Sequence, residues 1–397
     1  MQALSTILLG VFLLTVNSLA CENEVASPAH KITPSPGEAF TTSPQYPKIA
    51  SWVAKKDEII KSKKPYDFIM ADWFTVEEAQ MIRDQNPNVK ILAGAAISWV
   101  NEDINFINYI EVLGNLGTSK KIKIDDEMYL KKPNGEKCPF GWASDEFQQQ
   151  EFYVMDPRNP QWIELMTSFY KNILTQPHHD GITFDMVSET SPCPEAISDK
   201  EWLEATKEFM EGIKNINTEE KLVIINSGGY LSLIDEYSEY FDGFLLEKFL
   251  GKPFKKGWPS GANFHEGLRD AQSGKITIYA VDTDDTGVKD MNRMRLGLTL
   301  SLLNDNTYFT YDFGPRNHGQ AWWFPEYDAD LGVPLETYYE KDNAYWREFE
   351  NGTVVCSPDT DVTVTFDTIH KDITTSEQSQ TFEVSQGDGR IFLKSDS

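Results

Sequence analysis

Two short stretches of the chain repeat one pattern, and each ends in a carboxylate. Asp180–Asp185 (DGITFD) and Asp242–Glu247 (DGFLLE) both begin with Asp-Gly and both finish with an acid. If both stretches are strands, each acid lies at the carboxyl end of its strand. Hydrolysis of a glycosidic bond needs two carboxyl groups, one to protonate the leaving oxygen and one to attack or to activate water. We therefore interpret Asp185 and Glu247 as the catalytic pair of a glycoside hydrolase.

Two alternatives stand beside this interpretation. Acids at strand ends often form ion pairs with neighbouring basic residues, and Lys248 directly follows Glu247. The match between the two stretches favours chemistry over that structural role. The second alternative is a non-catalytic carbohydrate-binding barrel protein that has lost turnover, because fold analogy alone does not establish a reaction.

Polar and aromatic residues at the ends of other apolar runs are candidates for substrate binding. Carboxylates and amides suit sugar hydroxyls, and indole rings can stack on the C–H faces of sugars. Loop capping and core packing are the competing roles for these residue types. The sequence contains no H-E-x-x-H, C-x-x-C or calcium-loop pattern, so we expect no metal and no cofactor. The candidates are Asp72, Trp73, Trp99, Asn226, Asp282, Asp312, Trp322 and Trp323.

Eight short apolar runs, separated by amphipathic stretches, are the elements that must position these residues. Buried runs joined by helices indicate parallel strands, and eight such units predict an α/β fold, the (β/α)8 TIM barrel. Active sites of this fold lie at the carboxyl ends of the strands, where strands four and six would bring Asp185 and Glu247 together. A doubly wound sheet is the competing fold, but no G-x-G-x-x-G follows the first strand. The predicted strands are Lys48–Val53, Phe68–Trp73, Lys90–Ile97, Gly181–Val187, Leu222–Asn226, Gly243–Phe249, Lys275–Val281 and Thr307–Phe313.

Residues that begin and end helices occur between the runs. Thr75–Glu78 and Ser198–Glu201 are capping boxes, and Asn159 precedes a proline at a first helical position. Gly274 stands where a helix would end before the seventh strand. Beyond Trp346, short alternating runs predict a small C-terminal antiparallel β domain. These runs are Thr353–Cys356, Val362–Phe366, Thr381–Val384 and Arg390–Leu393.

The N-terminal residues predict export. An apolar run between Leu4 and Val16 is too short to span a bilayer, and Ser18-Leu19-Ala20 resembles a signal-peptidase site. Cys21 after Ala20 adds a lipid anchor as a second hypothesis, although Ser18 stands where such sites usually have Leu. We expect a signal peptide over 1–20, a flexible linker over 21–46, the catalytic barrel over 47–345 and the β domain over 346–397. The expected location is secreted or at the cell surface.

The four cysteines fit an oxidising compartment but do not by themselves define a pairing. Cys138 and Cys193 fall in loops that flank the same barrel unit, so a bridge between them is the first hypothesis. The formal net charge of −26 argues against nucleic acid or an anionic membrane as a partner, because both would repel the chain. The expected partner is a carbohydrate substrate. The sequence indicates neither its identity nor an oligomeric state.

Six stretches carry a family resemblance. They are Tyr66–Asp72, Asn86–Ala93, Met155–Pro160, Asp180–Asp185, Pro325–Pro334 and Trp346–Gly352. With these stretches the chain resembles the hypothetical glycosyl hydrolase 15 group of barrel proteins, from Pro47 to Pro358.

The resemblance implies the barrel fold and an acid on strand four, but no particular sugar. In better-understood barrel glycosidases that the chain looks like, the strand-four acid is the nucleophile and the strand-six acid is the proton donor. Carried over, these roles fall to Asp185 and Glu247, with retention of the anomeric configuration as the expected outcome. The insertion Gly117–Tyr153 departs from a minimal barrel, and we expect it to shape the cleft.

Overall fold

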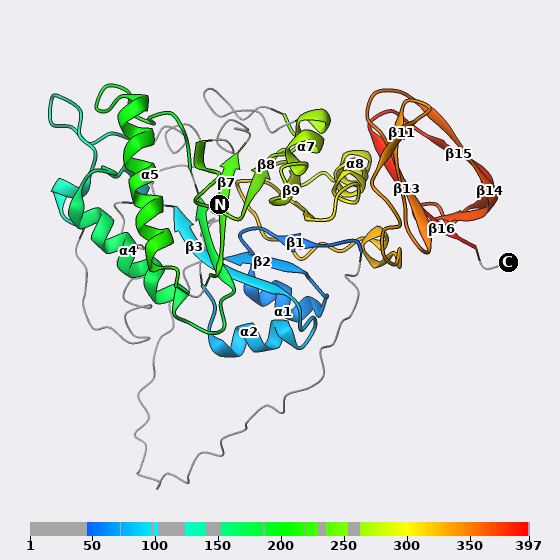
Figure 1. Cartoon of the computed structure of the whole chain (residues 1–397), viewed down its shortest axis with the longest axis horizontal. Helices are drawn as coiled ribbons and strands as arrows, with labels where there is room; N and C mark the ends of the chain where they lie inside the picture. Colours follow the sequence, from blue (N-terminus) through cyan, green and yellow to red (C-terminus); the bar gives the residue numbers. More distant parts are fainter. Residues whose placement is uncertain are drawn as a thin grey trace, which may run out of the picture.

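The chain forms a barrel of eight parallel strands with an antiparallel sheet at its C-terminal end, shown by the computed structural model in Figure 1. The structure describes residues 46–71, 73–96, 99–101, 124–139, 152–185, 187–218, 220–228, 236–252 and 263–395. A parallel bridge between Ile49 and Phe309 joins the first strand to the last, which confirms the predicted (β/α)8 barrel. The strands follow the order β1 (Ala50–Ser51), β2 (Phe68–Ala71), β3 (Lys90–Ala96), β6 (Gly181–Asp185), β7 (Leu222–Gly228), β8 (Gly243–Glu247), β9 (Ile276–Asp282) and β10 (Thr307–Asp312).

Helices that follow the strands cover the barrel. Both predicted capping boxes are present, since the Thr75 and Ser198 side chains accept from the backbone of Glu78 and Glu201. Asn159 caps the helix that begins at Pro160, as predicted. The helices are α1 (Lys56–Ser62), α2 (Val76–Arg83), α4 (Pro160–Leu174), α5 (Asp199–Ile216), α7 (Phe264–Ala271) and α8 (Met291–Ser301), with 3-10 turns η1 (Asp126–Met128) and η2 (Pro325–Asp328).

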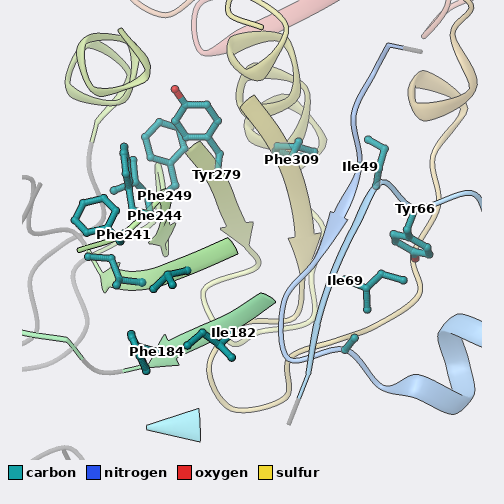
Figure 2. Packing of buried hydrophobic residues seen from close by; sticks show 14 of the residues in the cluster. Ile49, Tyr66, Ile69, Ile182, Phe184, Phe241, Phe244, Phe249, Tyr279 and Phe309 are labelled. Atoms are coloured by element: carbon teal, nitrogen blue, oxygen red, sulfur yellow. The ribbon is translucent and has the colours of Figure 1, made fainter. Parts of the chain in front are cut away.

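Alternation along the strands separates the side chains into two layers. The inner layer fills the barrel, and it includes Met70, Ile224 and Leu245. The outer layer packs against the helices, and Figure 2 shows Ile182, Phe244 and other members of it. Because successive side chains of a strand point to opposite faces, the inner set also defines which strand-end residues face the barrel axis.

Aspartates join neighbouring strands at the start of β2, β6 and β8. An Oδ2 atom of Asp67, Asp180 and Asp242 accepts the backbone N–H of Ile49, Ile91 and Val223, respectively, each at 2.8 Å. Each acceptor side chain therefore holds the start of its strand against the strand before it.

The glycines of the two Asp-Gly pairs have a steric role. A Cβ atom at Gly181 would lie 2.2 Å from the carbonyl oxygen of Leu222, and one at Gly243 would lie 2.5 Å from the Cβ of Ile276. Side chains larger than hydrogen cannot occupy these positions without displacing the next strand. Strand pairing and packing thus explain the Asp-Gly pair that begins each repeated stretch. They do not explain the acids that end the stretches, Asp185 and Glu247.

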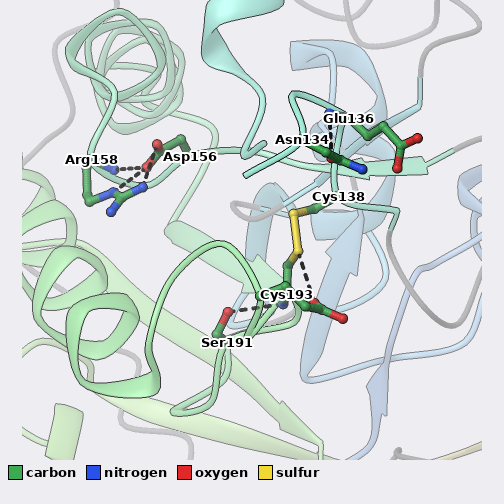
Figure 3. Close-up of a disulfide and its surroundings, with 8 residues drawn as sticks. Asn134, Glu136, Cys138, Asp156, Arg158, Ser191 and Cys193 are labelled. Atoms are coloured by element: carbon green, nitrogen blue, oxygen red, sulfur yellow. Dashed lines mark hydrogen bonds and ion pairs between the residues drawn. A yellow bond between two sulfur atoms is a disulfide. The ribbon is translucent and has the colours of Figure 1, made fainter. Parts of the chain in front are cut away.

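A disulfide joins Cys138 to Cys193, as the loop positions predicted (Figure 3). It ties the segment that carries the hairpin strands β4 (Trp99–Asn101) and β5 (Phe152–Val154) to the loop after β6. Cys356 is a buried free thiol. Much of the insertion 117–153 lies outside the described residues, so its expected role in the cleft remains a prediction.

The C-terminal sheet has six antiparallel strands in the order β11-β12-β13-β16-β14-β15. It begins at Tyr339, ahead of the boundary expected at Trp346. A tight turn at Asp342 and Asn343, both with positive φ, pairs β11 with β12. The strands are β11 (Tyr339–Lys341), β12 (Ala344–Glu348), β13 (Gly352–Ser357), β14 (Val362–Asp372), β15 (Gln378–Val384) and β16 (Asp388–Lys394), and the four predicted runs lie within the last four.

Helix α8 connects this sheet to the barrel. Arg295 of α8 donates two hydrogen bonds of 2.8 Å to the carboxylate of Asp388 on β16, and both side chains are buried. In the part of the chain that the structure describes, no helix has the length and apolarity needed to cross a bilayer. The expected signal peptide and linker lie outside the described residues, apart from Tyr46.

Candidate active site

Five polar residues end consecutive strands at the carboxyl end of the barrel. Asp185, Asn226, Glu247, Asp282 and Asp312 lie near the ends of β6, β7, β8, β9 and β10. Asn226, Glu247 and Asp282 each lie two residues beyond an inner-layer residue of their own strand, so their side chains point to the same face. Asp312 pairs with Asp282, and Asp185 lies two residues beyond Thr183, which pairs with the inner-layer residue Ile224. All five side chains therefore face the barrel axis. The structure therefore places these sequence-predicted residues around one end of the barrel, where enzymes of this fold hold their substrates.

The amide of Asn226 links the two acids of the predicted pair. Its Nδ2 donates to Asp185 Oδ1 at 2.8 Å and to Glu247 Oε2 at 2.9 Å. Because both oxygens accept hydrogen bonds from the same nitrogen, the distance between Asp185 Oδ1 and Glu247 Oε2 is at most the sum of the two hydrogen-bond lengths, about 5.7 Å. Because the N–H bonds of an amide diverge by about 120°, the expected separation is about 5 Å. The two carboxylates are close enough to act on the same bond.

A local irregularity in β7 orients this amide. The register between β7 and β8 shifts between Asn226 and Gly228, and Gly228 has a φ of 60°. The shift brings the backbone N–H of Gly228 to 2.9 Å from Asn226 Oδ1. With the amide oxygen engaged there, the NH₂ group must face the carboxylates. Bulges commonly redirect side chains beside functional sites in this way.

His318 completes the group and was not among the residues predicted from the sequence. The histidine follows β10 in a loop, where its Nε2 lies 2.8 Å from Glu247 Oε1 and its Nδ1 lies 2.9 Å from Asp312 Oδ2. Asp312 also accepts the backbone N–H groups of Gly314 and Gly319. The available signal was position: a histidine in the loop after the last strand lies at the active-site end of a barrel.

Hydrogen bonding and burial act in opposite directions on the ionisation of Glu247 and His318. Burial favours a raised pKa for Glu247, but bonds from His318 and Asn226 and the charge of Lys248 outweigh it and lower the pKa. Burial likewise favours a lowered pKa for His318, but Asp312 and Glu247 outweigh it and raise the pKa well above its usual range. The arrangement is a cationic imidazole between two carboxylates.

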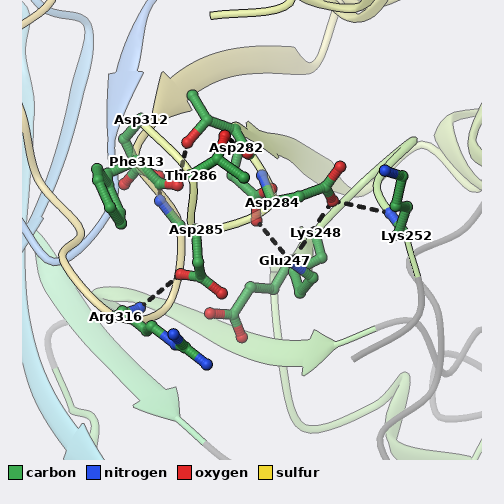
Figure 4. Close-up of polar contacts among 12 residues, drawn as sticks. Glu247, Lys248, Lys252, Asp282, Asp284, Asp285, Thr286, Asp312, Phe313 and Arg316 are labelled. Carbon is green, nitrogen blue, oxygen red and sulfur yellow. Dashed lines mark hydrogen bonds and ion pairs between the residues drawn. The ribbon is translucent and has the colours of Figure 1, made fainter. Parts of the chain in front are cut away.

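Lys248 forms an ion pair with Asp282, whereas the sequence suggested Glu247 as its partner. Its Nζ lies 3.3 Å from Asp282 and 3.8 Å from Asp284, and Figure 4 shows it extending toward these acids. A positive φ of 52° at Lys248 turns the chain immediately after Glu247. Burial raises the pKa of Asp282 to about 6, while Lys248 opposes the shift. Asp282 also accepts the backbone N–H of Asp284, which matches the loop-capping alternative.

Two of the tryptophan candidates, Trp322 and Trp323, pack against other aromatic side chains. Trp322 packs on Tyr311 and beneath Lys289, and Trp323 packs edge-on against Tyr66. Trp322, Trp323 and Trp73 are partly buried, and all three pack against the outer layer of the barrel. Asp72 lies outside the described residues, and so does the side chain of Trp99.

Trp52 was not predicted but lies in the inner layer, edge-on to the His318 ring at 6.4 Å. Its buried indole N–H has no acceptor among the described residues. It is therefore a polar donor close to the site that a bound molecule could use. Across the same ranges, no group of three or more His, Cys, Asp or Glu side chains is placed to hold a metal ion.

The sequence profile of hypothetical glycosyl hydrolase family 15 matches residues 83–353, more than half of the chain. The chain belongs to this family. The match covers the strands that carry Asp185, Asn226 and Glu247, as well as the His318 loop. A comparison with curated proteins found no match.

Several solved structures resemble this family member at low similarity. A maltogenic alpha-amylase from Thermotoga neapolitana is 10% identical, with a TM-score of 0.47 over 85% of this chain and 93% of that one. An alpha-amylase from Malbranchea cinnamomea is 10% identical, with a TM-score of 0.46 over 84% and 87%. An alpha-galactosidase from Thermus thermophilus is 12% identical, with a TM-score of 0.46 over 77% and 65%. At these values we assign no substrate and no residue role from them.

The position of Asn226 generates a pH-dependent prediction. In Asn226→Asp, a third carboxyl group is buried between two others, so its folded-state pKa rises above the unfolded value of about 3.9. The folded state of the variant therefore becomes less stable as the pH rises from the unfolded-state pKa toward the raised folded-state pKa. We expect stability near that of the wild type at pH 4 and a loss of about 2–3 kcal/mol at pH 7, measured by urea unfolding. The control is Asn134→Asp in an exposed turn, where Asp can accept the same backbone bond. An equal loss at both pH values would contradict repulsion among the acids.

Proposed function

We propose that the protein is a glycoside hydrolase that cleaves O-glycosidic bonds in a polysaccharide or oligosaccharide, with Asp185 and Glu247 as its catalytic pair. The observation that carries the proposal is the amide of Asn226, which holds an oxygen of each acid within about 5.7 Å of the other. Family membership supports the same reaction class. The strand-end position of the pair fits the usual location of active sites in this fold.

The separation favours retention of the anomeric configuration. Retaining enzymes hold their carboxyl groups about 5–5.5 Å apart, whereas inverting enzymes leave about 6.5–9.5 Å for a water molecule. A limit of about 5.7 Å between one oxygen of each acid leaves too little room for that water. The proposed reaction is therefore a double displacement, in which one acid forms a covalent glycosyl intermediate and the other transfers protons.

Substitution of either acid tests the pair. Asp185→Asn and Glu247→Gln each remove a carboxylate but keep an amide of the same shape that can still accept from Asn226, so the fold should persist. We expect each change to reduce hydrolysis about 10²–10⁴-fold in a polysaccharide screen with product analysis, with a nearly unchanged melting temperature. Glu204→Gln, on the exposed face of α5, is the control and should retain full activity.

Two outcomes would oppose the pair assignment. Substantial activity in either variant would show that the substituted acid is dispensable. Binding of a polysaccharide by the wild type, without turnover of any substrate, would favour the carbohydrate-binding alternative.

The stereochemical course is a separate prediction. A double displacement inverts the anomeric carbon twice, so the first product should carry the anomeric configuration of the substrate. Proton NMR of the product, recorded before mutarotation, distinguishes the two anomers. First appearance of the opposite anomer would exclude a glycosyl intermediate on either acid.

We also propose that the protein is exported, with cleavage after Ala20. The apolar segment before Ser18-Leu19-Ala20 supports this proposal. The buried disulfide between Cys138 and Cys193 is also consistent with an oxidising compartment. Mass spectrometry of protein from the native host should show Cys21 as the first residue, and a diacylglyceryl mass on Cys21 would identify a lipid anchor. An intact N-terminal Met1 would contradict export by this signal.

A further inference from the structure

Asp312, His318 and Glu247 form one hydrogen-bonded chain across the active-site end of the barrel. Each nitrogen of the His318 ring faces a carboxylate oxygen, at 2.9 Å from Asp312 and 2.8 Å from Glu247. An ionised carboxylate can only accept hydrogen bonds, and a neutral imidazole carries only one N–H. Both contacts are hydrogen bonds to ionised acids only if the ring is doubly protonated. With both acids ionised, this geometry therefore favours the cationic form of His318.

The same chain constrains Glu247. Its Oε1 faces the His318 ring and its Oε2 accepts from Asn226, so both oxygens are held by donors. These donors stabilise the ionised form, and the lowered pKa of Glu247 has this origin despite the opposing effect of burial. A general acid needs the opposite environment, because it must carry a proton before the reaction begins. A nucleophile needs an ionised and well-oriented carboxylate.

We propose that His318, anchored by Asp312, is a positioning residue that keeps Glu247 ionised and makes Glu247 the nucleophile, with Asp185 as the acid/base. This proposal rests on the proposed function of the pair. It exchanges the two roles that the family resemblance implies. With Glu247 as the nucleophile, the proton transfers fall to Asp185, the other acid of the pair, which is half-buried and accepts a hydrogen bond from the Asn226 amide.

The proposed reaction has two steps. An oxygen of Glu247 attacks the anomeric carbon and forms an ester bond while the glycosidic C–O bond breaks, and Asp185 gives its proton to the leaving oxygen. Water then attacks the same carbon and gives a proton to Asp185, and the ester bond to Glu247 breaks. His318 keeps both of its protons throughout. The negative charge that returns to Glu247 in the second step is again stabilised by His318 and Asn226.

Several charged groups face this chain and contribute to its titration. Lys248 acts on Glu247 from the end of β8, and Asp282 on β9 interacts with Asp312. Asp185 reaches Glu247 through Asn226, and the Trp52 ring on the β1 side is uncharged. Replacing His318 by a neutral residue removes a cation directly bonded to Glu247. The pKa of Glu247 should then rise, so the ionised nucleophile should be lost at a higher pH than in the wild type.

The protonation state of His318 is tested first, without reference to activity. Proton–nitrogen NMR of the uniformly ¹⁵N-labelled chain distinguishes a doubly protonated ring from a neutral one. The signals that disappear in His318→Gln belong to His318, and His265→Gln, at an exposed histidine bonded to Asp359, is the matched control. We expect a doubly protonated His318 at pH 8, where an ordinary histidine is neutral. A neutral His318 at that pH would overturn the proposal.

The nucleophile is tested on a substrate from the screen. A 2-deoxy-2-fluoro glycoside with a good leaving group should trap the glycosyl intermediate, and peptide mass spectrometry should locate the sugar on Glu247. Sugar on Asp185 would overturn the proposal. In His318→Gln, which keeps a donor but no charge, we expect the acidic limb of the kcat/KM profile to move up by about one pH unit. His265→Gln should leave the profile unchanged, and an unchanged profile in His318→Gln would contradict the role of His318.

Failure of the proposed function would look different from failure of this inference. A chain without any hydrolytic activity, but with a doubly protonated His318, would refute both the proposed function and the nucleophile assignment. A chain that hydrolyses through Asp185 as nucleophile would leave the proposed function intact and refute only the exchange of roles.

Discussion

Every second side chain of the eight parallel strands must fit within the barrel, and this constraint organises the rest of the molecule. Apolar residues such as Met70, Ile224 and Leu245 fill the interior below the carboxyl ends of the strands. At the carboxyl ends the inner positions hold acids and an amide, which cannot be buried without partners. The hydrogen bonds from Asp185 through Asn226 and Glu247 to His318 satisfy this requirement. The same side chains that close the interior therefore form the candidate site.

The strands were predictable because each one depends on a local pattern. Buried runs of apolar residues indicated all eight, and the caps at Thr75, Asn159 and Ser198 indicated where helices begin. The Asp-Gly pairs were also visible, although their structural purpose was not: the aspartates hold the preceding strand and the glycines admit the next one. These features involve residues that are adjacent in the sequence or on neighbouring strands.

The contacts within the site were less predictable because they join distant parts of the chain. His318 and Glu247 are 71 residues apart, and the order β8-β9-β10 in the curved sheet brings the loop after β10 over the end of β8. Lys248 stood beside Glu247 in sequence, but the turn that follows β8 directs it to Asp282. Trp322 and Trp323 illustrate the converse, since aromatic residues in an active-site loop can equally cover the outer layer. Residue type and position in a loop do not distinguish these outcomes.

Helix α8 has an environment that differs from that of an ordinary barrel helix. From Met294 to Ser301 every residue is buried. Gly297 lies against Val281 and Phe309 of the barrel, and Thr299 lies against Gly389 of the C-terminal sheet. A helix covered on all sides has no polar face to present to water. The C-terminal sheet is consequently not an interchangeable module in the evolutionary sense. Gene fusions or deletions that separate it from the barrel would have to remake a surface for α8, so the two parts are expected to be inherited together.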